Sequence, residues 1–354
     1  MRRVLAGLAL SLAVWACAPG EAGTGTAEQD VGTKPERAWT PAPVKAGNLR
    51  IATFNIRNFP KDTMGAAGNG GAPAADGGPA DEEPPAEIAP RRDPETDLAM
   101  LIELLDKLDF DVLGVEEIND SSALDAVLER LGEKNGRRYA SVYTTEWPHP
   151  QRVGIVVRAD RLRIESPEEH PEIATRPTMR AGLSARIVSQ KSGGADFGML
   201  VLHLASGDSA GRAKLRAEQA AQAASVVAAR QRELGDEDFI VVGDLNTARA
   251  DEMPSFDEAI AQASGLSRQR NASGCSTYYV KGKGNPLLEP SMIDHVYTSS
   301  LAERDDAVAL TSGAHCAERA CAPFESSGEE SGTSYWGVSD HCPVYFEIAD
   351  EDRD

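Results

Sequence analysis

The sequence predicts an α/β fold, a sandwich in which mixed β-sheets are covered by helices on the outside. Short runs rich in Val, Ile, Leu or aromatic residues recur along the chain, each bounded by turn residues, as is typical of strands. Helical stretches separate most of these runs, but several runs follow one another directly, so there is no strict β-α-β alternation. The expected strands are 49–55, 111–116, 139–143, 153–158, 183–188, 198–203, 238–243, 293–298 and 343–348.

Three helices are expected between the strands. The first carries a single apolar stripe on an otherwise charged surface, formed by Leu98, Leu101, Ile102, Leu105 and Leu108. A second helix is expected to begin near Ser122, because Asp125 follows three residues later as a weak capping box. The longest covers 211–234 and is rich in Ala, Gln, Glu and Arg.

The N-terminal segment 1–17 is expected to direct export rather than to fold. Arg2 and Arg3 precede an apolar run, 4–16, that is too short to span a bilayer, which is typical of a secretory signal. Cys17 follows a small residue and resembles the cysteine of a bacterial lipobox, so we expect a lipid anchor to the bacterial outer membrane or an extracellular protein. The alternative is an ordinary signal peptide with an incidental cysteine.

The remaining chain is expected to form one domain over 48–349, with two segments outside its packing. Residues 18–47 are mostly Gly, Ala, Pro, Thr and Glu, too poor in apolar side chains to fold, and are expected to be a flexible tether. Residues 60–94 form a Gly/Ala/Pro insert without periodicity, expected to be a disordered surface loop.

Four cysteines remain after Cys17, and an even number in an exported chain predicts two disulfides. They are Cys275, Cys316, Cys321 and Cys342. Cys316 and Cys321 are near enough to close a small loop, which would leave Cys275 with Cys342, although the sequence does not fix the connectivity. A zinc site is the alternative, disfavoured because tight paired ligand spacing is missing.

The net charge of −20 disfavours a broad basic surface of the kind that usually binds nucleic acid. Many carboxylates lie in the tether, in the segment 76–95 and in the tail 349–354. A local basic face in the domain is therefore still compatible with the charge.

Polar residues cluster where the expected strands end, and this is the main functional signal. Ligands of open α/β sheets bind at the carboxyl ends of strands. The residues are Asn55, Glu117, His203, Asp244, Asn246, Asp294, Asp340 and His341.

This series resembles the endonuclease/exonuclease/phosphatase superfamily over about residues 48–348, most specifically in Gly-Asp-Leu-Asn (243–246) and Ser-Asp-His (339–341). The resemblance implies a four-layer sandwich of two mixed sheets packed face to face. Within the superfamily, residues 51–59 are similar to the first strand of pancreatic-type deoxyribonuclease. Glu146 matches the glutamate that orients one of that enzyme's two catalytic histidines, and Arg180 resembles an arginine that contacts the DNA backbone, with Arg176 competing for that place.

The resemblance implies a role for each polar residue, and the roles suit phosphodiester cleavage, since a hard cation with oxygen ligands stabilises the charge that develops on phosphoryl oxygens. Mg²⁺ is the expected cation, with Mn²⁺ or a structural Ca²⁺ as alternatives. Glu117 is the principal ligand, with Asn55 and Asp340 nearby, and Glu116 is expected on the opposite face of the strand.

Two histidines are expected to move protons. His341, fixed by Asp294, takes a proton from water, and His203, held by Glu146, protonates the leaving oxygen. Asp244 and Asn246 hold a second cation, the water or the phosphate, together with Arg180 on the substrate side. Asp244 is the alternative base.

The sequence thus predicts an exported, metal-dependent endonuclease that hydrolyses DNA, acts as a monomer and meets the membrane only through its lipid anchor. The same chemistry on a phospholipid, sphingomyelin or inositol-phosphate headgroup is the alternative. A catalytically inactive surface binding protein is a third reading, disfavoured because every expected catalytic position is filled.

Overall fold

The computed structural model describes residues 38–61, 95–247, 251–280, 287–300, 309–325 and 333–353. The predicted signal segment with Cys17, most of the tether and most of the Gly/Pro insert lie outside the described residues. The end of the predicted tether is described, and it packs on the domain. Trp39 is buried, and its backbone N–H donates to Glu318 Oε1 at 3.0 Å.

Two six-stranded sheets form the centre of the domain. The first has the strand order β13-β15-β1-β2-β4-β3, and the second has the order β5-β6-β7-β8-β12-β9. Both are mixed, because β1 pairs with β2, and β7 with β8, in parallel while the other pairs are antiparallel. The strands of the first sheet are β13 (Thr311–Ser312), β15 (Val344–Ala349), β1 (Asn48–Phe59), β2 (Val112–Ile118), β4 (Arg152–Arg158) and β3 (Tyr139–Tyr143). Those of the second are β5 (Leu162–His170), β6 (Gly182–Ser189), β7 (Asp196–His203), β8 (Phe239–Asp244), β12 (Asp294–Thr298) and β9 (Ser267–Arg268).

The sheets pack face to face through alternate side chains of their strands. Ile51 of β1 and Val242 of β8 belong to one apolar cluster between the sheets. At Gly114 of β2 the sheets come so close that an added Cβ would lie 2.8 Å from Val242 Cγ2. Glycine is therefore required there for the sheets to approach.

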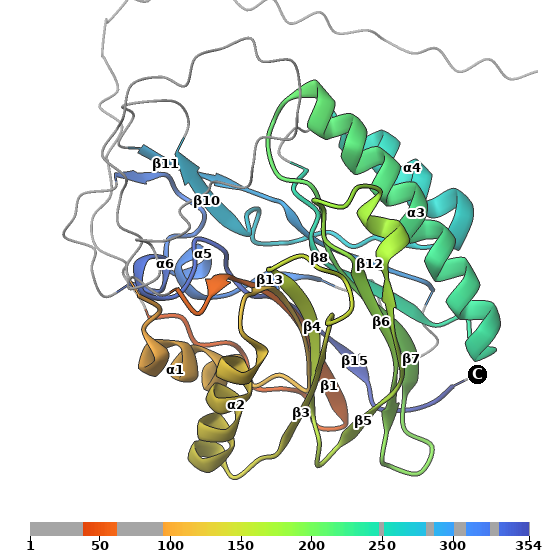
Figure 1. The fold of residues 1–354 in the computed structure, drawn as a ribbon. Helices are drawn as coiled ribbons and strands as arrows, with labels where there is room; N and C mark the ends of the chain where they lie inside the picture. Colours follow the sequence, from red (N-terminus) through yellow and green to blue (C-terminus); the bar gives the residue numbers. More distant parts are fainter. Residues whose placement is uncertain are drawn as a thin grey trace, which may run out of the picture. The chain divides into compact units, whose positions relative to one another are not determined.

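Helices cover the outer face of each sheet (Figure 1). The helices α1 (Leu98–Leu108) and α2 (Ser121–Asn135) lie against the first sheet, and α3 (Ala210–Leu234) and α4 (Met253–Ser264) against the second. The predicted four-layer α/β sandwich is confirmed. The start of α2 differs in detail: Asp120 is the N-cap, and its carboxylate accepts hydrogen bonds from the backbone N–H groups of Ser122 and Ala123.

A small third sheet extends from the sandwich, and both disulfides lie beside it. It consists of β10 (Thr277–Val280), β11 (Leu287–Ser291) and β14 (Phe324–Glu325), next to the short helices α5 (Ala314–Glu318) and α6 (Ser334–Gly337).

The two predicted disulfides are present, but the suggested pairing is wrong. Cys275 bonds to Cys321 and Cys316 to Cys342. The backbone N–H of Cys316 on α5 donates to Cys342 Sγ, so Cys316 faces the residue just before the last strand. Cys321, in contrast, has a positive φ of 56°. Nearness in sequence did not decide the bonds.

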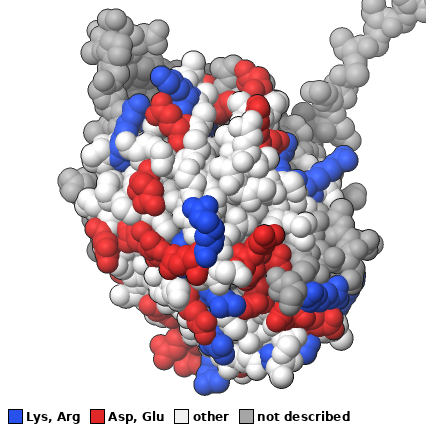
Figure 2. Space-filling model, turned by 90° about the vertical axis from the view of Figure 1, so that its right-hand side faces the viewer, with Lys and Arg blue, Asp and Glu red and all other residues white. Residues whose placement is uncertain are grey.

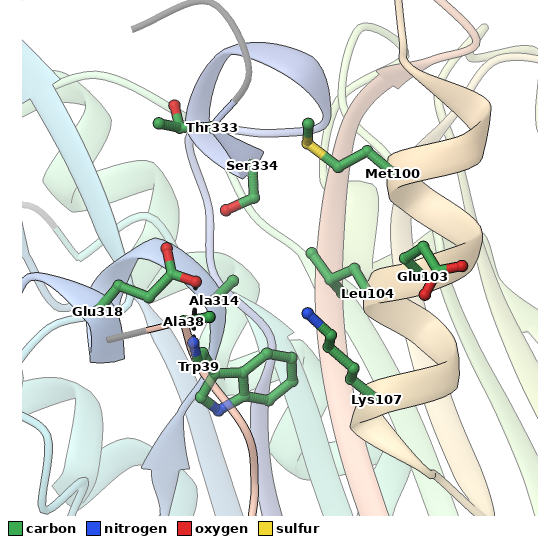
Figure 3. Close-up of a pocket in the computed structure, with 10 residues that line it drawn as sticks. All are labelled: Ala38, Trp39, Met100, Glu103, Leu104, Lys107, Ala314, Glu318, Thr333 and Ser334. Atoms are coloured by element: carbon green, nitrogen blue, oxygen red, sulfur yellow. Dashed lines mark hydrogen bonds between the residues drawn. The ribbon is translucent and has the colours of Figure 1, made fainter. Parts of the chain in front are cut away.

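A pocket of about 390 Å³ lies between α1 and the segment that carries Trp39 (Figure 3). Met100 and Leu104 from α1 face Trp39 and Ser334 across it. None of the residues predicted for the catalytic site lines this pocket. Among the helices of the described residues, none combines the length and apolar character needed to cross a membrane.

Candidate active site

The polar residues at the strand ends continue the side-chain stripes that fill the space between the sheets. On β1, Asn55 lies four residues beyond Ile51 and therefore on the same face. The apolar stripes of β7 and β8 end in the same way at His203 and Asp244, which are paired in register. Asp294 of β12 lies opposite Asp244 on the other side. The same alternation of side chains along the strands thus forms the core between the sheets and, at one end of this core, brings the polar residues of the site together.

Asn55 links the carboxylates of the two sheets. Its Nδ2 donates to Glu117 Oε1 and to Asp244 Oδ2, both at 3.1 Å, and its Oδ1 accepts the backbone N–H of Arg57 at 2.9 Å. The sequence placed Asn55 among the cation ligands through its amide oxygen. In the structure that oxygen is used by the backbone, and the residue holds Glu117 and Asp244 together.

Glu117 reaches the site because the strand is irregular at this position. Its φ is 60°, and the pairing of β2 with β4 shifts register between Val115 and Ile118. An irregularity of this kind re-aims a side chain next to an active site. Glu117 Oε2 also accepts the backbone N–H of Asn58 at 2.9 Å, which fixes the second carboxylate oxygen.

Glu116 stays between the sheets and does not face the substrate side. It is fully buried, and Thr53 Oγ1 donates to its Oε1 at 2.7 Å. Burial raises the pKa of the Glu116 carboxyl well above its usual value, and the nearby Asp294 and Asp244 act in the same direction. Glu116 therefore lies beneath the site in surroundings that favour its protonated form.

His341 is held by Asp294, as the sequence predicts for this pair. Its Nδ1 lies 2.9 Å from Asp294 Oδ2 and 3.1 Å from Oδ1, and its other ring nitrogen, Nε2, lies 3.8 Å from Asp244 Oδ2. Burial opposes the charged imidazolium, but Asp294 and Asp244 outweigh it, so the pKa of His341 is raised well above 6.5. The same crowding, with burial as the largest cause, raises the pKa of Asp244 to about 7.

His203 lies on the other side of Asp244 and has a different environment. Its Nε2 is 2.7 Å from Arg180 Nη2 and 3.5 Å from Asp244 Oδ2. An arginine only donates, so this Nε2 is an acceptor and the ring proton is on Nδ1. Burial, and then the charge of Arg180, lower the pKa of His203 well below 6.5. His203 is thus a neutral imidazole beside a guanidinium.

The structure does not bring Glu146 to His203, which corrects the predicted role of this glutamate. Glu169 accepts the backbone N–H groups of Thr145, Glu146 and Trp147 at 2.9, 2.9 and 2.7 Å, and the loop folded in this way leaves Glu146 exposed. Within the described part of the chain, His203 Nδ1 has no hydrogen-bond partner.

Asn246 and Asp340 border the site. Asn246 has a φ of 53°, and its Nδ2 donates to the backbone oxygen of Leu204 at 3.1 Å. Asp340 pairs with Arg57, whose Nε lies 3.4 Å from its Oδ1. Burial opposes ionisation of Asp340, but Arg57 and His341 lower its pKa. Asp340 was predicted as a cation ligand, and in the structure its carboxylate faces a guanidinium.

Gln151 supports the Glu117 side of the site and was not among the residues predicted from the sequence. It directly precedes β4, the strand that pairs with β2 beside Glu117. Its Nε2 donates to Asn58 Oδ1 at 2.6 Å, and Asn58 in turn binds Glu117. The only available signal was its place at the start of an expected strand.

Comparisons with known proteins agree with this geometry. The model of the endonuclease/exonuclease/phosphatase family matches residues 52–341. The chain belongs to this family. No curated protein matches the chain.

Solved structures of endonuclease/exonuclease/phosphatase proteins share the fold. A family member from Bacteroides thetaiotaomicron is 18% identical, with a TM-score of 0.52 over 85% of this chain and 97% of its own. TDP2 from D. rerio, complexed with a single strand DNA product, is 15% identical, with a TM-score of 0.51 over 85% and 98%. A mannosyl-6-phosphatase from Bacteroides thetaiotaomicron is 18% identical, with a TM-score of 0.50 over 84% and 98%. At these identities the likeness shows a common fold.

Members of the endonuclease/exonuclease/phosphatase family are typically metal-dependent phosphoesterases and nucleases, which supports hydrolase activity in general. The residues of this chain fit a divalent cation. Donor atoms of Glu117, His203 and Asp244 lie within 4.8 Å of one another. Glu117 and Asp244 are drawn together by one amide, and after burial, the largest cause, repulsion from Asp294 and Glu117 also raises the pKa of Asp244. A cation with a preference for oxygen ligands would relieve this repulsion.

Donor atoms of Asp244, Asp294 and His341 form another such group, and a further one, His315, Cys316 and Cys342, lies beside the third sheet. Both cysteines are consumed in their disulfide. A thiolate zinc site is therefore absent from this group.

Proposed function

We propose that the protein is an exported phosphodiesterase that uses Mg²⁺ to hydrolyse DNA. The observation that carries the proposal is the placement of two histidines on either side of one carboxylate. His203 Nε2 and His341 Nε2 lie 3.5 and 3.8 Å from the same atom, Asp244 Oδ2. Hydrolysis of a phosphodiester needs one proton removed from water and one delivered to the leaving oxygen, and two imidazoles on opposite sides of the phosphate can serve both needs.

The hydrogen bonds support an assignment of these roles opposite to that expected from the sequence. Nε2 of His203 accepts an N–H of Arg180, and its lone pair can accept the proton of the attacking water once Arg180 binds the phosphate instead. His341 is stabilised as the imidazolium by Asp294, so it can deliver a proton from Nε2 to the leaving oxygen. A bound divalent cation would supply positive charge to the phosphoryl oxygens, held by Glu117 and Asp244.

Arg180 supports a phosphate as the ligand. Its side chain is almost completely buried, and Glu117 and Asp244 are its main opposite charges. The guanidinium therefore lies at the floor of the site, where it can bind a phosphoryl oxygen. This fits the substrate-binding role expected for Arg180.

The preference for DNA rests on the resemblance of residues 51–59 to pancreatic-type deoxyribonuclease and on the paired histidines. The D. rerio TDP2 structure, with its single strand DNA product, shows that the fold accommodates DNA in another protein. The mannosyl-6-phosphatase structure favours a second candidate, a phosphate ester of a sugar or lipid headgroup.

The test is a substrate panel with a matched variant. The purified protein is incubated with plasmid, single-stranded DNA, sphingomyelin vesicles and a sugar phosphate, each with Mg²⁺ and with a chelator. We expect Mg²⁺-dependent cleavage of DNA that is lost in His341→Ala and in His203→Ala. Intact DNA together with hydrolysis of a headgroup or sugar ester would reject DNA in favour of the second candidate. Inactivity on every ester would support a binding protein.

Export, the lipid anchor on Cys17 and the monomeric state belong to the same proposal. Two disulfides are consistent with an extracellular location. We expect the full chain to partition into detergent and the Cys17→Ala variant to stay in the aqueous phase. Equal partitioning of the two would reject the lipid anchor.

A further inference from the structure

Two consecutive apolar side chains are exposed on β10, the strand next to the catalytic segment. Among the described residues only three large apolar side chains are exposed, namely Leu98, Tyr279 at 44% and Val280 at 40%. A single exposed apolar residue needs no explanation. Tyr279, however, lies near His341, because β10 is hydrogen-bonded through its backbone to the segment 340–342.

Residues 340–342 run beside β10 like a further antiparallel strand. Thr277 forms an antiparallel bridge with His341, and the backbone N–H of Cys342 donates to the oxygen of Ser276 at 2.7 Å. On the same edge, the N–H of Tyr278 donates to the oxygen of Asp340 at 3.2 Å. The strand is thus fixed to the backbone that carries the catalytic histidine.

This pairing determines where the side chain of Tyr279 points. Residues directly opposite in an antiparallel pair project from the same face, so Thr277 and His341 share a face. Tyr279 lies two residues beyond Thr277 and therefore projects from that face as well. Tyr279 therefore lies about 7 Å along the strand from Thr277, the residue opposite His341. This distance is about the length of one nucleotide of the proposed substrate.

Tyr279 has no role in the core, in contrast to its neighbour. Tyr278 projects from the opposite face, is 1% exposed, and packs against Phe324 with ring centroids 5.0 Å apart. Within the part of the chain that the structure describes, no other ring packs on Tyr279. Tyr278 thus anchors the strand, and the strand presents Tyr279 to solvent on the catalytic side.

We propose that Tyr279 is a specificity-determining residue, an aromatic platform that stacks on a nucleobase beside the phosphate under attack. The inference rests on the proposed function, and it narrows the substrate to DNA with unstacked bases, because a base inside a duplex has no free face. Stacking of a base on an aromatic ring is worth about 1–3 kcal/mol and needs no basic residues.

The charge of the protein agrees with this mode of binding. On the face that Figure 2 shows, Asp and Glu side chains gather in patches and Lys and Arg lie scattered among them. The chain as a whole carries a net charge of −20. A stacked base would add affinity for DNA beyond what phosphate contacts supply.

The test compares a single-stranded oligonucleotide with a strand of equal length built from abasic tetrahydrofuran units. In Tyr279→Ala we expect KM for the ordinary strand to rise about tenfold with kcat unchanged, as stacking of roughly 1.4 kcal/mol predicts. For the abasic strand, the wild type and Tyr279→Ala should have the same KM. Tyr279→Trp should keep the KM of the wild type, and Leu98→Ala is the control for loss of an exposed apolar side chain.

Three results would overturn the inference. An unchanged KM of Tyr279→Ala for the ordinary strand would show that no base stacks on Tyr279, while leaving the proposed function intact. An equal rise on both strands would show that Tyr279 acts on the fold of the site and not on a base. A wild type that cleaves neither strand would reject the proposed function, and the inference with it.

Discussion

At the level of single residues, Gln151 supports the Glu117 side of the site, whereas the predicted partner of His203, Glu146, is exposed. The chain of hydrogen bonds from Gln151 through Asn58 to Glu117 fixes the carboxylate that faces the cation position. Partners of this kind typically change metal affinity or activity by 10–100-fold when they are removed. The exposed Glu146 makes no comparable contact with the site among the described residues.

Gln151→Leu should therefore lower the apparent affinity for Mg²⁺ by about tenfold, measured by titrating activity with the metal. Glu146→Gln is the matched control and should leave the affinity unchanged. If instead Glu146→Gln abolished activity and Gln151→Leu did not, the glutamate would hold His203 in the working enzyme and the loop would adopt another conformation.

His295 shows how a buried histidine couples stability to pH. Its Nε2 lies 2.8 Å from Thr247 Oγ1, and burial lowers its pKa to about 4. In the unfolded chain His295 is protonated below about pH 6.5, whereas in the folded chain it stays neutral down to about pH 4. The contribution of neutral His295 is therefore complete above pH 6.5 and is lost as pH falls towards 4.

With about 1.4 kcal/mol for each pKa unit, this loss amounts to roughly 3 kcal/mol between pH 7 and pH 4. Urea unfolding across this range should show a fall in the free energy of unfolding that is smaller in His295→Gln. The same pH dependence in variant and wild type would mean that His295 is not buried in its neutral form.

At the level of elements, the Cys316–Cys342 disulfide joins α5 to the residue that follows His341. The segment that carries His341 is thus fixed on one side by β10 and on the other by a covalent bond. The double variant Cys316→Ser/Cys342→Ser should lose about 2–5 kcal/mol of stability in urea unfolding. Its kcat should fall as well, because His341 loses its fixed position against Asp294. Full stability and kcat in this variant would show that backbone pairing alone holds the segment.

Elements with a strong apolar pattern could be predicted from the sequence, and those without it could not. The stripe of α1 gave its bounds correctly, since five leucine or isoleucine positions repeat with the helical period. The strand β5 was missed because its residues 165–169 are mostly acidic and exposed, which hides the alternation. The helix α4 was missed as well, because its apolar face is short.

At the scale of the whole molecule, the sequence predicted which residues form the site but not how they meet. Polar residues at strand ends were sufficient to predict that most of these side chains lie together, because a sandwich gathers the ends of its inner stripes. The contact of Asn55 with Asp244 joins two different sheets. The direction of the Glu117 side chain depends on the positive φ of this residue. Disulfide pairing and loop folding likewise depend on tertiary structure, which no local pattern encodes.

The central claim is that Glu117 and Asp244, held together by Asn55, bind one divalent cation between His203 and His341. Anomalous diffraction from crystals grown with Mn²⁺ tests it directly. We predict a single strong peak in contact with the carboxylates of Glu117 and Asp244, and its loss in Glu117→Gln. A peak elsewhere in the domain, or none at these carboxylates at saturating Mn²⁺, would contradict the claim.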